Sequence, residues 1–314
     1  MGALPEDGEG RTVEGMLSLY VIGCGGIGGH LLSHLLESLA SLDLDMLEKF
    51  MRPAEFTRHL ENFGKDVTPS IVDRIVLVDG DEYSPRNALR QGHAAGSKME
   101  ICMSELDHSA IRQTYFRLTD LVGVNCYINP DNMAKIIPRC QARNNANDGG
   151  CLADRPSHFS NMLRETWPGT RDMPVIFLCV DNVKTRYEIS KYAESFDNIL
   201  VINGGNEKTS GHVTVYERRD GLALDPNLPD VYPDVKADAD LRPDEQDTCT
   251  HIAPKHDQVS DTNELIAIYM RRFFNRWLMK GLSSYGPKGQ DRFNEILIDL
   301  ESMTTMPVYH PPRT

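Results

Sequence analysis

Acidic, cationic and amide side chains that could together bind one ligand are concentrated in residues 78–98, VDGDEYSPRNALRQGHAAGSK. Two carboxylates one residue apart come first, and the remaining polar groups follow: Asp79, Asp81, Asn87, Arg90, Gln91 and Lys98. Carboxylates suit sugar hydroxyls or a metal ion, whereas Arg and Lys suit phosphate oxygens. One ligand that needs all of these groups is a metal-bound nucleotide.

Two apolar runs end in acids and predict the strands that position such a site. Residues 71–78, IVDRIVLV, run directly into Asp79, and residues 175–180, VIFLCV, run into Asp181 and Asn182. Runs of this length and composition are typical of buried strands. Because ligands of open α/β sheets bind at the carboxyl ends of strands, these acids are predicted to line one crevice.

A glycine-rich turn precedes both runs. Residues 16–42 read as a strand, a glycine cluster and a leucine-rich helix, and Gly23, Gly25 and Gly28 fit the pattern G-x-G-x-x-G. Such a turn lets a phosphate approach a helix N-terminus, although the same glycines would also serve a turn that only packs tightly. In a dinucleotide fingerprint the ribose-binding acid follows about 20 residues later. Asp79 lies 51 residues beyond Gly28, which disfavours an ordinary dehydrogenase.

Composition limits the class of protein. The chain of 314 residues is 40% hydrophobic and 25% charged, and it has no apolar run of about 18 residues that could cross a bilayer. Its first residues, 1–15, lack the order of a secretory signal, so we expect a flexible tail and a cytoplasmic protein. A net charge of -13 makes nucleic acid an unlikely partner. Seven scattered cysteines without a C-x-x-C pair predict neither a disulfide framework nor a structural zinc site.

The remaining pattern predicts an α/β fold: a Rossmann-like, mostly parallel sheet with helices on both faces and antiparallel strands added at the C-terminal side. Helices are expected at 98–117, 157–166, 184–195 and 261–282. Further strands are expected at 122–128, 199–203, 212–218, 294–300 and 306–309. Residues 220–250 have little periodicity and predict a long loop.

Three signals in order resemble the ThiF/MoeB/HesA superfamily, the adenylating fold of ubiquitin-activating enzymes. They are GCGGIGG, then DGDEYSPRNALRQ, and then a strand ending in Asp-Asn with Arg186 five residues after the Asp. The superfamily pattern D-x-D-x-x-x-x-x-N-x-x-R-Q is filled without a gap by Asp79, Asp81, Asn87, Arg90 and Gln91. The triplet 96–98, Gly-Ser-Lys, is similar to its G-x-x-K step with one residue fewer.

The resemblance implies a role for each matching residue. Gly25 and Gly26 would lie against ATP, Asp79 would bind the ribose hydroxyls, and Asp181 would position Mg²⁺. Arg90 and Lys98 would hold the phosphates, while Asp81, Asn87 and Gln91 would complete the lip of the pocket. Attack of a carboxylate on the α-phosphate brings two anions together, so cations and a metal must neutralise the charge. For any one of these residues alone, the alternative is a surface ion pair or a helix cap.

A cysteine far along the chain has a second implied role. The segment 247–250, Asp-Thr-Cys-Thr, resembles the thioester-cysteine segment of ubiquitin-activating enzymes and of ThiF-family proteins from PRTRC-type and prokaryotic ubiquitin-like systems. Cys249 would then attack the acyl adenylate and keep the acyl group as a thioester; the alternative is an idle thiol on a loop. Cys24, inside the glycine turn, is expected to be a small packing residue.

The resemblance divides the chain into a tail (1–15), an ATP-binding adenylation core (16–220), a mobile loop carrying Cys249 (221–257), and a C-terminal helix and strands on the same core (258–314). It implies a homodimer, a ubiquitin-like or sulfur-carrier protein as the acyl partner, and a conjugating enzyme further along the pathway. Superfamily members commonly supply an arginine to the phosphates from the partner protomer's N-terminal segment, where this chain has Arg11 alone. Either Arg11 serves in this way or the function is absent. The zinc-binding cysteine pairs of many bacterial members are missing.

Other functions stay open at this point. A ThiF-like enzyme acting on a small molecule, a peptide or a tRNA would use the same pocket. An NAD(P)-dependent oxidoreductase would use the glycine turn, and a non-catalytic scaffold subunit would be expected to lack some of the pocket residues.

Overall fold

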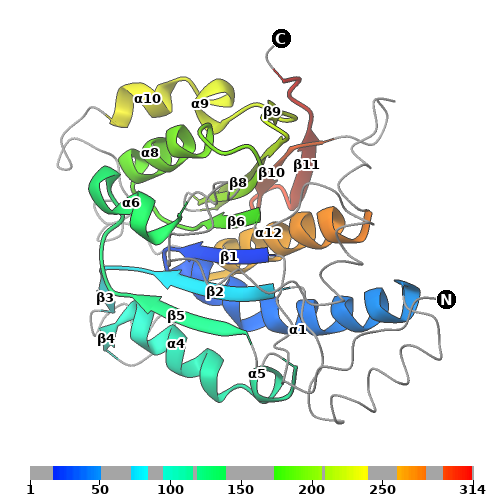
Figure 1. The fold of residues 1–314 in the computed structure, drawn as a ribbon. Coiled ribbons are helices and arrows are strands. Elements are labelled where there is room, and N and C mark those ends of the chain that lie inside the picture. Colours follow the sequence, from blue (N-terminus) through cyan, green and yellow to red (C-terminus); the bar gives the residue numbers. More distant parts are fainter. Residues whose placement is uncertain are drawn as a thin grey trace, which may run out of the picture.

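The computed structural model describes residues 17–50, 72–83, 95–115, 119–138, 173–206, 209–239, 260–280 and 293–312. At its centre lies a parallel sheet with the strand order β7-β6-β1-β2-β5 (Figure 1). Its strands are β1 (Leu17–Ile22), β2 (Val72–Val78), β5 (Asp120–Val124), β6 (Met173–Leu178) and β7 (Ile199–Asn206). Because all five run the same way, their carboxyl ends meet at one edge of the sheet.

Antiparallel strands extend this sheet beyond β7. The order continues β7-β8-β10-β11, and a short strand β9 also pairs with β8. These strands are β8 (Ser210–Arg219), β9 (Leu222–Ala223), β10 (Glu295–Asp299) and β11 (Thr304–Val308). The predicted fold class, a mostly parallel sheet with antiparallel strands on the C-terminal side, is therefore confirmed.

Helices cover both faces of the sheet, as Figure 1 shows. One face carries α1 (Gly26–Phe50), α4 (Lys98–His108), α5 (Ala110–Tyr115) and α12 (Ser260–Lys280). The other carries α6 (Pro130–Ile136) and α8 (Val183–Ala193), with α9 (Leu228–Val231) and α10 (Asp234–Ala239) beside α8. Side chains of a strand alternate between these two cores: Val175 and Phe177 of β6 face α12, whereas Ile176 and Leu178 face α8.

The structure differs from the sequence prediction in several places. The predicted loop 220–250 contains β9, α9 and α10 within its described part, and the rest of it lies outside the described residues. Helix α1 continues without a break to Phe50, beyond the predicted strand-turn-helix segment 16–42. Strand β5 begins at Asp120 and ends at Val124, earlier than predicted. The predicted helix 157–166 lies outside the described residues.

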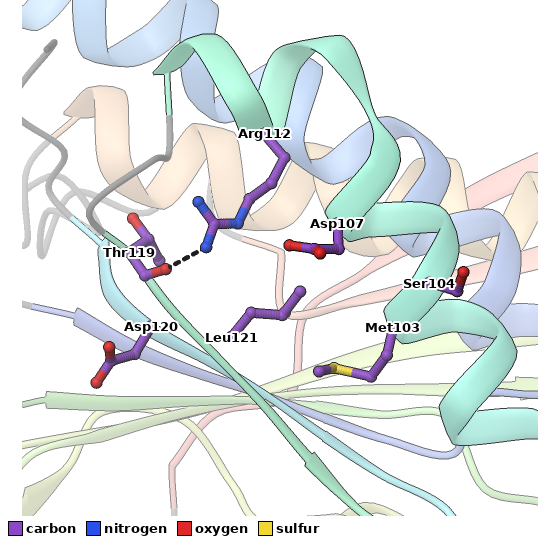
Figure 2. Close-up of a pocket in the computed structure, with 7 residues that line it drawn as sticks. All are labelled: Met103, Ser104, Asp107, Arg112, Thr119, Asp120 and Leu121. Carbon is purple, nitrogen blue, oxygen red and sulfur yellow. Dashed lines mark hydrogen bonds between the residues drawn. The ribbon is translucent and has the colours of Figure 1, made fainter.

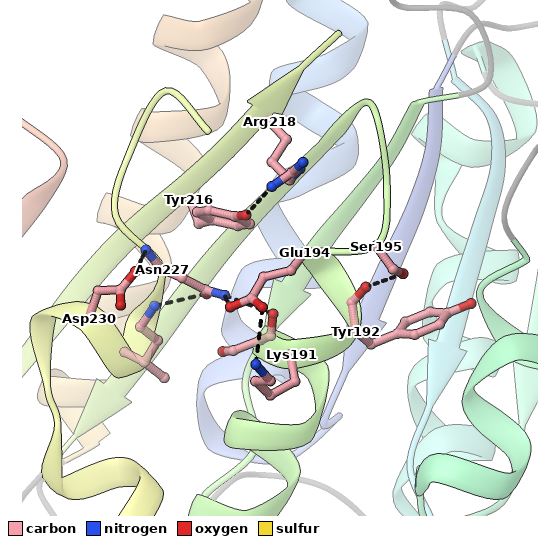
Figure 3. A network of polar contacts seen from close by, with 10 residues as sticks. Lys191, Tyr192, Glu194, Ser195, Tyr216, Arg218, Asn227 and Asp230 are labelled. Carbon is pink, nitrogen blue, oxygen red and sulfur yellow. Dashed lines mark hydrogen bonds and ion pairs between the residues drawn. The ribbon is translucent and has the colours of Figure 1, made fainter. Parts of the chain in front are cut away.

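The sequence pattern did not predict α9 and α10, because the segment that contains them shows no apolar periodicity. Polar hydrogen bonds at the start of α9 stabilise this segment. Asn227 accepts a hydrogen bond from the Leu228 N–H (2.9 Å) at the start of α9. Its amide group donates to the Ser190 carbonyl oxygen (2.8 Å) and to Glu194 Oε1 (3.1 Å), both on or next to α8. Figure 3 shows this network, in which Lys191 also pairs with Glu194. The segment is thereby tied to the end of α8.

Among the helices that the structure describes, none combines the length and the apolar composition needed to span a bilayer.

The packing of α12 on the sheet generates a prediction about stability. Phe274 is fully buried, and its ring meets that of Phe177 edge-on at 5.3 Å between centroids. We expect Phe274→Ala to lower the free energy of unfolding by about 3–5 kcal/mol, because it leaves a cavity between helix and sheet. Leu222→Ala, a matched apolar change at a side chain that is 69% exposed, should change it by about 0.5 kcal/mol or less. Denaturant unfolding of the two variants measures both values, and equal losses would contradict this packing.

Candidate functional site

Backbone hydrogen bonds join the strands just past their carboxyl ends. Gly23 N–H donates to the Val78 carbonyl oxygen (2.9 Å), Cys179 N–H donates to Ile22 (2.8 Å), and Asp79 N–H donates to Val124 (3.2 Å). The turns that follow β1, β2 and β6 are therefore held side by side. These are the turns that carry the glycine cluster and the acids Asp79 and Asp181.

The glycine turn is built for close approach. Gly23 has φ +94°, which favours glycine, and a Cβ added there would lie 2.8 Å from the Cys179 carbonyl group. A Cβ at Gly28 would lie only 1.9 Å from the Gly23 carbonyl oxygen. Helix α1 begins at Gly26 with no acidic residue in its first turn, so its free N–H groups favour an anion at this position. Gly25 and Gly26 are both partly exposed there.

Asp79 ties the glycine turn to the acidic loop. Its Oδ2 accepts a hydrogen bond from the Cys24 N–H (2.6 Å), and its Oδ1 accepts one from the Asp81 N–H (2.8 Å). Burial raises the pKa of Asp79, and the two N–H donors together with Lys98 offset this only in part. Each carboxylate oxygen keeps a further lone pair, so the group can still accept hydrogen bonds from a ligand hydroxyl.

Lys98 reaches the same place from another part of the chain. The short antiparallel strands β3 (Glu82–Tyr83) and β4 (Gly96–Ser97) pair, and the Lys98 N–H donates to the Asp81 carbonyl oxygen (3.0 Å). Lys98 Nζ forms an ion pair with Asp81 Oδ2 (3.0 Å), and a Cβ at Gly25 would lie 3.8 Å from this ammonium group. Strand pairing therefore places a cation directly beside the glycine turn.

The charges around Lys98 are mostly negative. Burial lowers the pKa of Lys98, but the carboxylates of Asp79, Asp81 and Asp181 raise it above its ordinary value. Its side chain is only 18% exposed. The group is therefore a fixed positive charge among three acids that come from the ends of β2 and β6.

Asp181 lies exposed just past β6, and the residue after it starts the next helix. Asn182 accepts a hydrogen bond from the Thr185 N–H (3.0 Å) and so caps α8. Arg186, which the sequence pattern singled out, is buried and points back to the strand ends. It donates to Asn203 Oδ1 (2.6 Å) and to the carbonyl oxygens of Val180 and Gly204. Arg186 therefore connects the end of β6 to β7.

The structure thus brings together Gly25, Gly26, Asp79, Asp81, Lys98 and Asp181 at one edge of the sheet. Asn87, Arg90, Gln91, Cys249 and Arg11 lie outside the described residues. Cys24 is fully buried, and the neighbouring Cys102 and burial raise the pKa of its thiol, as expected for a packing residue.

Two tyrosines at this edge were missed by sequence reasoning. Tyr83 OH donates to the Cys24 carbonyl oxygen (2.6 Å), and Tyr127 OH donates to Asp81 Oδ1 (2.5 Å). Tyr83 directly follows the D-x-D-E pattern, so its place beside the turn was open to prediction. Tyr127 comes after β5, more than 40 residues from Asp81, and no local spacing signals the contact.

No protein-family model matches the sequence, and no curated protein matches it. The fold, however, is similar to solved structures of E. coli MccB. The structure described as MccB with ATP is 13% identical and has a TM-score of 0.50; the match covers 94% of this chain and 64% of that chain. The structure described as the microcin C7 biosynthetic enzyme MccB in complex with N-formylated MccA is 15% identical, with the same coverage and TM-score.

This chain therefore spans about 64% of the length of the MccB chains that it matches. At such low identity the likeness concerns the fold alone. It supports the α/β fold predicted from the apolar runs and the glycine turn, and it does not support the PRTRC-type subgroup in particular.

A separate hollow of about 480 Å³ lies between α4, α5 and the amino end of β5 (Figure 2). Arg112 crosses it and donates to the Thr119 carbonyl oxygen (2.8 Å), with Asp107 and Asp120 nearby. Because the glycine turn lies at the carboxyl ends of the strands, this hollow is not part of the candidate site.

Two glycines of the turn should respond differently to the same change. Gly28→Ala should disturb folding, because its Cβ would overlap the Gly23 carbonyl oxygen. Gly25→Ala should fold normally, since its Cβ meets Lys98 Nζ at an ordinary 3.8 Å, but it should weaken nucleotide binding by intruding where Lys98 meets the turn. Thermal unfolding and titration with Mg-ATP measure the two effects. A destabilised Gly25→Ala would contradict this geometry.

Asp79 and Asp81 should affect stability with opposite dependence on pH. Because its pKa is raised in the folded protein, Asp79 contributes fully to the free energy of unfolding below about pH 4. This contribution is lost as the pH rises through the raised pKa. Burial raises the pKa of Asp81, but the Tyr127 hydroxyl and Lys98 outweigh it and lower that pKa; its contribution is present above about pH 4 and lost as the pH falls.

We therefore expect the difference in unfolding free energy between wild type and Asp79→Asn to fall as the pH rises above about pH 4. The difference between wild type and Asp81→Asn should instead fall as the pH drops below about pH 4. Loss of hydrogen bonds in either variant changes the difference in unfolding free energy by a constant amount and leaves its dependence on pH unchanged. Equal slopes for the two variants would show that the assigned pKa shifts are wrong.

Proposed function

We propose that this protein is an ATP-dependent adenylyltransferase that activates the carboxylate of a peptide or carrier protein. The observation that carries the proposal is the Lys98 ammonium group, held beside the glycine turn and among the carboxylates of Asp79, Asp81 and Asp181. A cation at the turn suits a triphosphate, and acids around it suit a ribose and a metal ion. Hydride transfer would require neither the lysine nor the third acid.

Each described residue has a place in this reaction. The N–H groups at the start of α1, next to Gly25 and Gly26, would donate hydrogen bonds to the phosphate oxygens. Asp79 would bind the ribose hydroxyls through its remaining lone pairs, and Lys98 would neutralise charge at the phosphates. Asp81 holds Lys98 in position. Asn87, Arg90 and Gln91 would complete the pocket, as the superfamily pattern implies.

The acids also fit a magnesium ion bound in the usual manner for nucleotides. Among the described residues no group of three or more His, Cys, Asp and Glu side chains could hold a metal ion by itself. Mg²⁺ in nucleotide sites commonly uses one or two carboxylates together with phosphate oxygens and water. The exposed Asp181 is such a carboxylate, and a bound ion would supply positive charge to the phosphates.

The chemistry is a displacement at phosphorus. A carboxylate oxygen of the acyl partner attacks the α-phosphorus of ATP, the bond to the oxygen that bridges the α- and β-phosphates breaks, and pyrophosphate leaves. The acyl adenylate remains in the pocket. Lys98 lowers the barrier because attacking and leaving groups are both anionic and the charge grows on the phosphate oxygens.

The finer identity of the partner is part of this proposal. MccB, whose fold is similar, has been solved with ATP and with MccA, which supports a peptide or carrier partner. We propose a ubiquitin-like or sulfur-carrier protein whose C-terminal carboxylate enters the pocket. A homodimer, with Arg11 of the partner protomer serving the phosphates, follows from the superfamily pattern, as does a conjugating enzyme downstream.

Cys249 would perform a second half-reaction. Its thiolate would attack the carbonyl carbon of the acyl adenylate, the bond to the AMP oxygen would break, and a thioester with free AMP would result. Adenylation does not require this later step, so the two can be tested apart.

ATP binding provides a direct test. Mg-ATP at about 100 times its Kd should add about 2.7 kcal/mol to the free energy of unfolding, whereas NAD⁺ should add nothing. Asp181→Ala should lose most of this gain because the metal-bound phosphates lose a ligand. Asp197→Ala, the same change at an exposed aspartate before β7, is the matched control and should keep it. Protection by NAD⁺ and not by Mg-ATP would overturn the proposal.

The acyl step is tested by exchange of labelled pyrophosphate into ATP. Synthetic peptides with free C-terminal carboxylates should support exchange, and their amidated counterparts should not. Asp181→Ala should abolish exchange, while Cys249→Ala should keep it and lose only a thiol-sensitive adduct on non-reducing gels. Exchange that survives Asp181→Ala would contradict the site assignment.

A further inference from the structure

Tyr127 is exposed but firmly held. Its side chain is 66% exposed, yet its carbonyl oxygen accepts a hydrogen bond from Asn132 Nδ2 (2.9 Å), a member of the capping box of α6. A Cβ at Gly80 would lie 2.7 Å from the Tyr127 backbone nitrogen. The glycine therefore lets the Tyr127 backbone rest directly on the loop that carries Asp79 and Asp81.

The Tyr127 hydroxyl is the first member of a chain of polar contacts. It donates to Asp81 Oδ1 (2.5 Å), and Asp81 Oδ2 accepts from Lys98 Nζ (3.0 Å). The two oxygens of one carboxylate are thus held from opposite sides. The contact with Asp81 also raises the pKa of Tyr127 to about 12, so the hydroxyl stays a donor at neutral pH.

This arrangement decides where the Lys98 ammonium group lies. A carboxylate held by one partner alone turns easily about its last torsion angle, because that torsion has a broad energy minimum. Two partners fix it, and the fixed Oδ2 then holds Lys98 Nζ beside Gly25. A lysine side chain has many rotamers, so without a fixed acceptor its charge would spread over several positions.

We propose that Tyr127 is a positioning residue for nucleotide binding: its hydroxyl fixes the Asp81 carboxylate, which holds Lys98 beside the glycine turn. The inference rests on the proposed function, since that assigns the phosphates to Lys98. A role in overall stability is a poor alternative, because Asp81 is 44% exposed and ion pairs and hydrogen bonds at such sites contribute little to folding. The contact between Tyr127 and Asp81 therefore serves mainly to position Lys98 and adds little to the free energy of unfolding.

A double-mutant cycle tests this proposal on the full chain. The Kd for Mg-ATP is measured by calorimetry for wild type, Tyr127→Phe, Asp81→Asn and the double variant. Tyr127→Phe keeps the ring and should weaken binding about threefold to tenfold, the effect of losing one typical hydrogen bond. In the Asp81→Asn background the same change should have no further effect, because the hydroxyl acts through the carboxylate.

Tyr269→Phe is the matched control. The Tyr269 hydroxyl donates to Thr305 Oγ1 (3.2 Å) at the antiparallel end of the sheet, so its removal should leave the Kd unchanged. Without nucleotide, the unfolding midpoint of Tyr127→Phe should lie only slightly below that of wild type, because a hydrogen bond to an exposed carboxylate contributes little to folding. An unchanged Kd in Tyr127→Phe, or an equal loss in both backgrounds, would overturn the inference alone. Failure of the wild type to bind Mg-ATP would overturn the proposed function itself.

Discussion

The Asp79 carboxylate is the contact on which the candidate site depends. It accepts hydrogen bonds from the backbone N–H groups of Cys24 and Asp81, so one side chain joins the turn after β1 to the turn after β2. Burial of this charge is unfavourable, as its raised pKa shows. The two N–H donors reduce the free-energy cost of burying the carboxylate, and they connect the glycine turn to the acidic loop. Tyr83 strengthens this connection by donating to the Cys24 carbonyl oxygen.

The charges around Asp79 would suit the proposed ligand, a nucleotide that carries a metal ion. Lys98 lies among three acids, and Asp81 takes up one of its hydrogen bonds. A triphosphate would bring negative charge to the lysine and the helix N-terminus, and its metal ion would bring positive charge to Asp181. Each charge would then face its opposite. A nucleotide without the metal would leave Asp181 facing phosphate oxygens.

The ends of the strands are held in place by a buried arginine, by backbone hydrogen bonds and by the packing of a helix. Arg186 is buried and spans the ends of β6 and β7 through Asn203 and two backbone carbonyl oxygens. Backbone hydrogen bonds join the turns past β1, β2 and β6. The buried side of α12 packs against one face of the same strands, where Phe274 contacts Phe177. A site whose atoms must stay fixed to within about 0.5 Å needs such support.

The sequence by itself determined the class of fold and the types of residue at the site. Apolar runs that end in Asp79 and Asp181 predict parallel strands with acids at one edge, because side-chain burial sets the strand pattern locally. The glycine spacing of 23–28 predicts the turn for the same local reason. Only the tertiary structure decided which atoms meet. The β3–β4 pairing brings Lys98 to Asp81, and Gly80 admits Tyr127 from beyond β5. These contacts join segments far apart in the chain, and no periodicity or spacing encodes a distance that is set by packing.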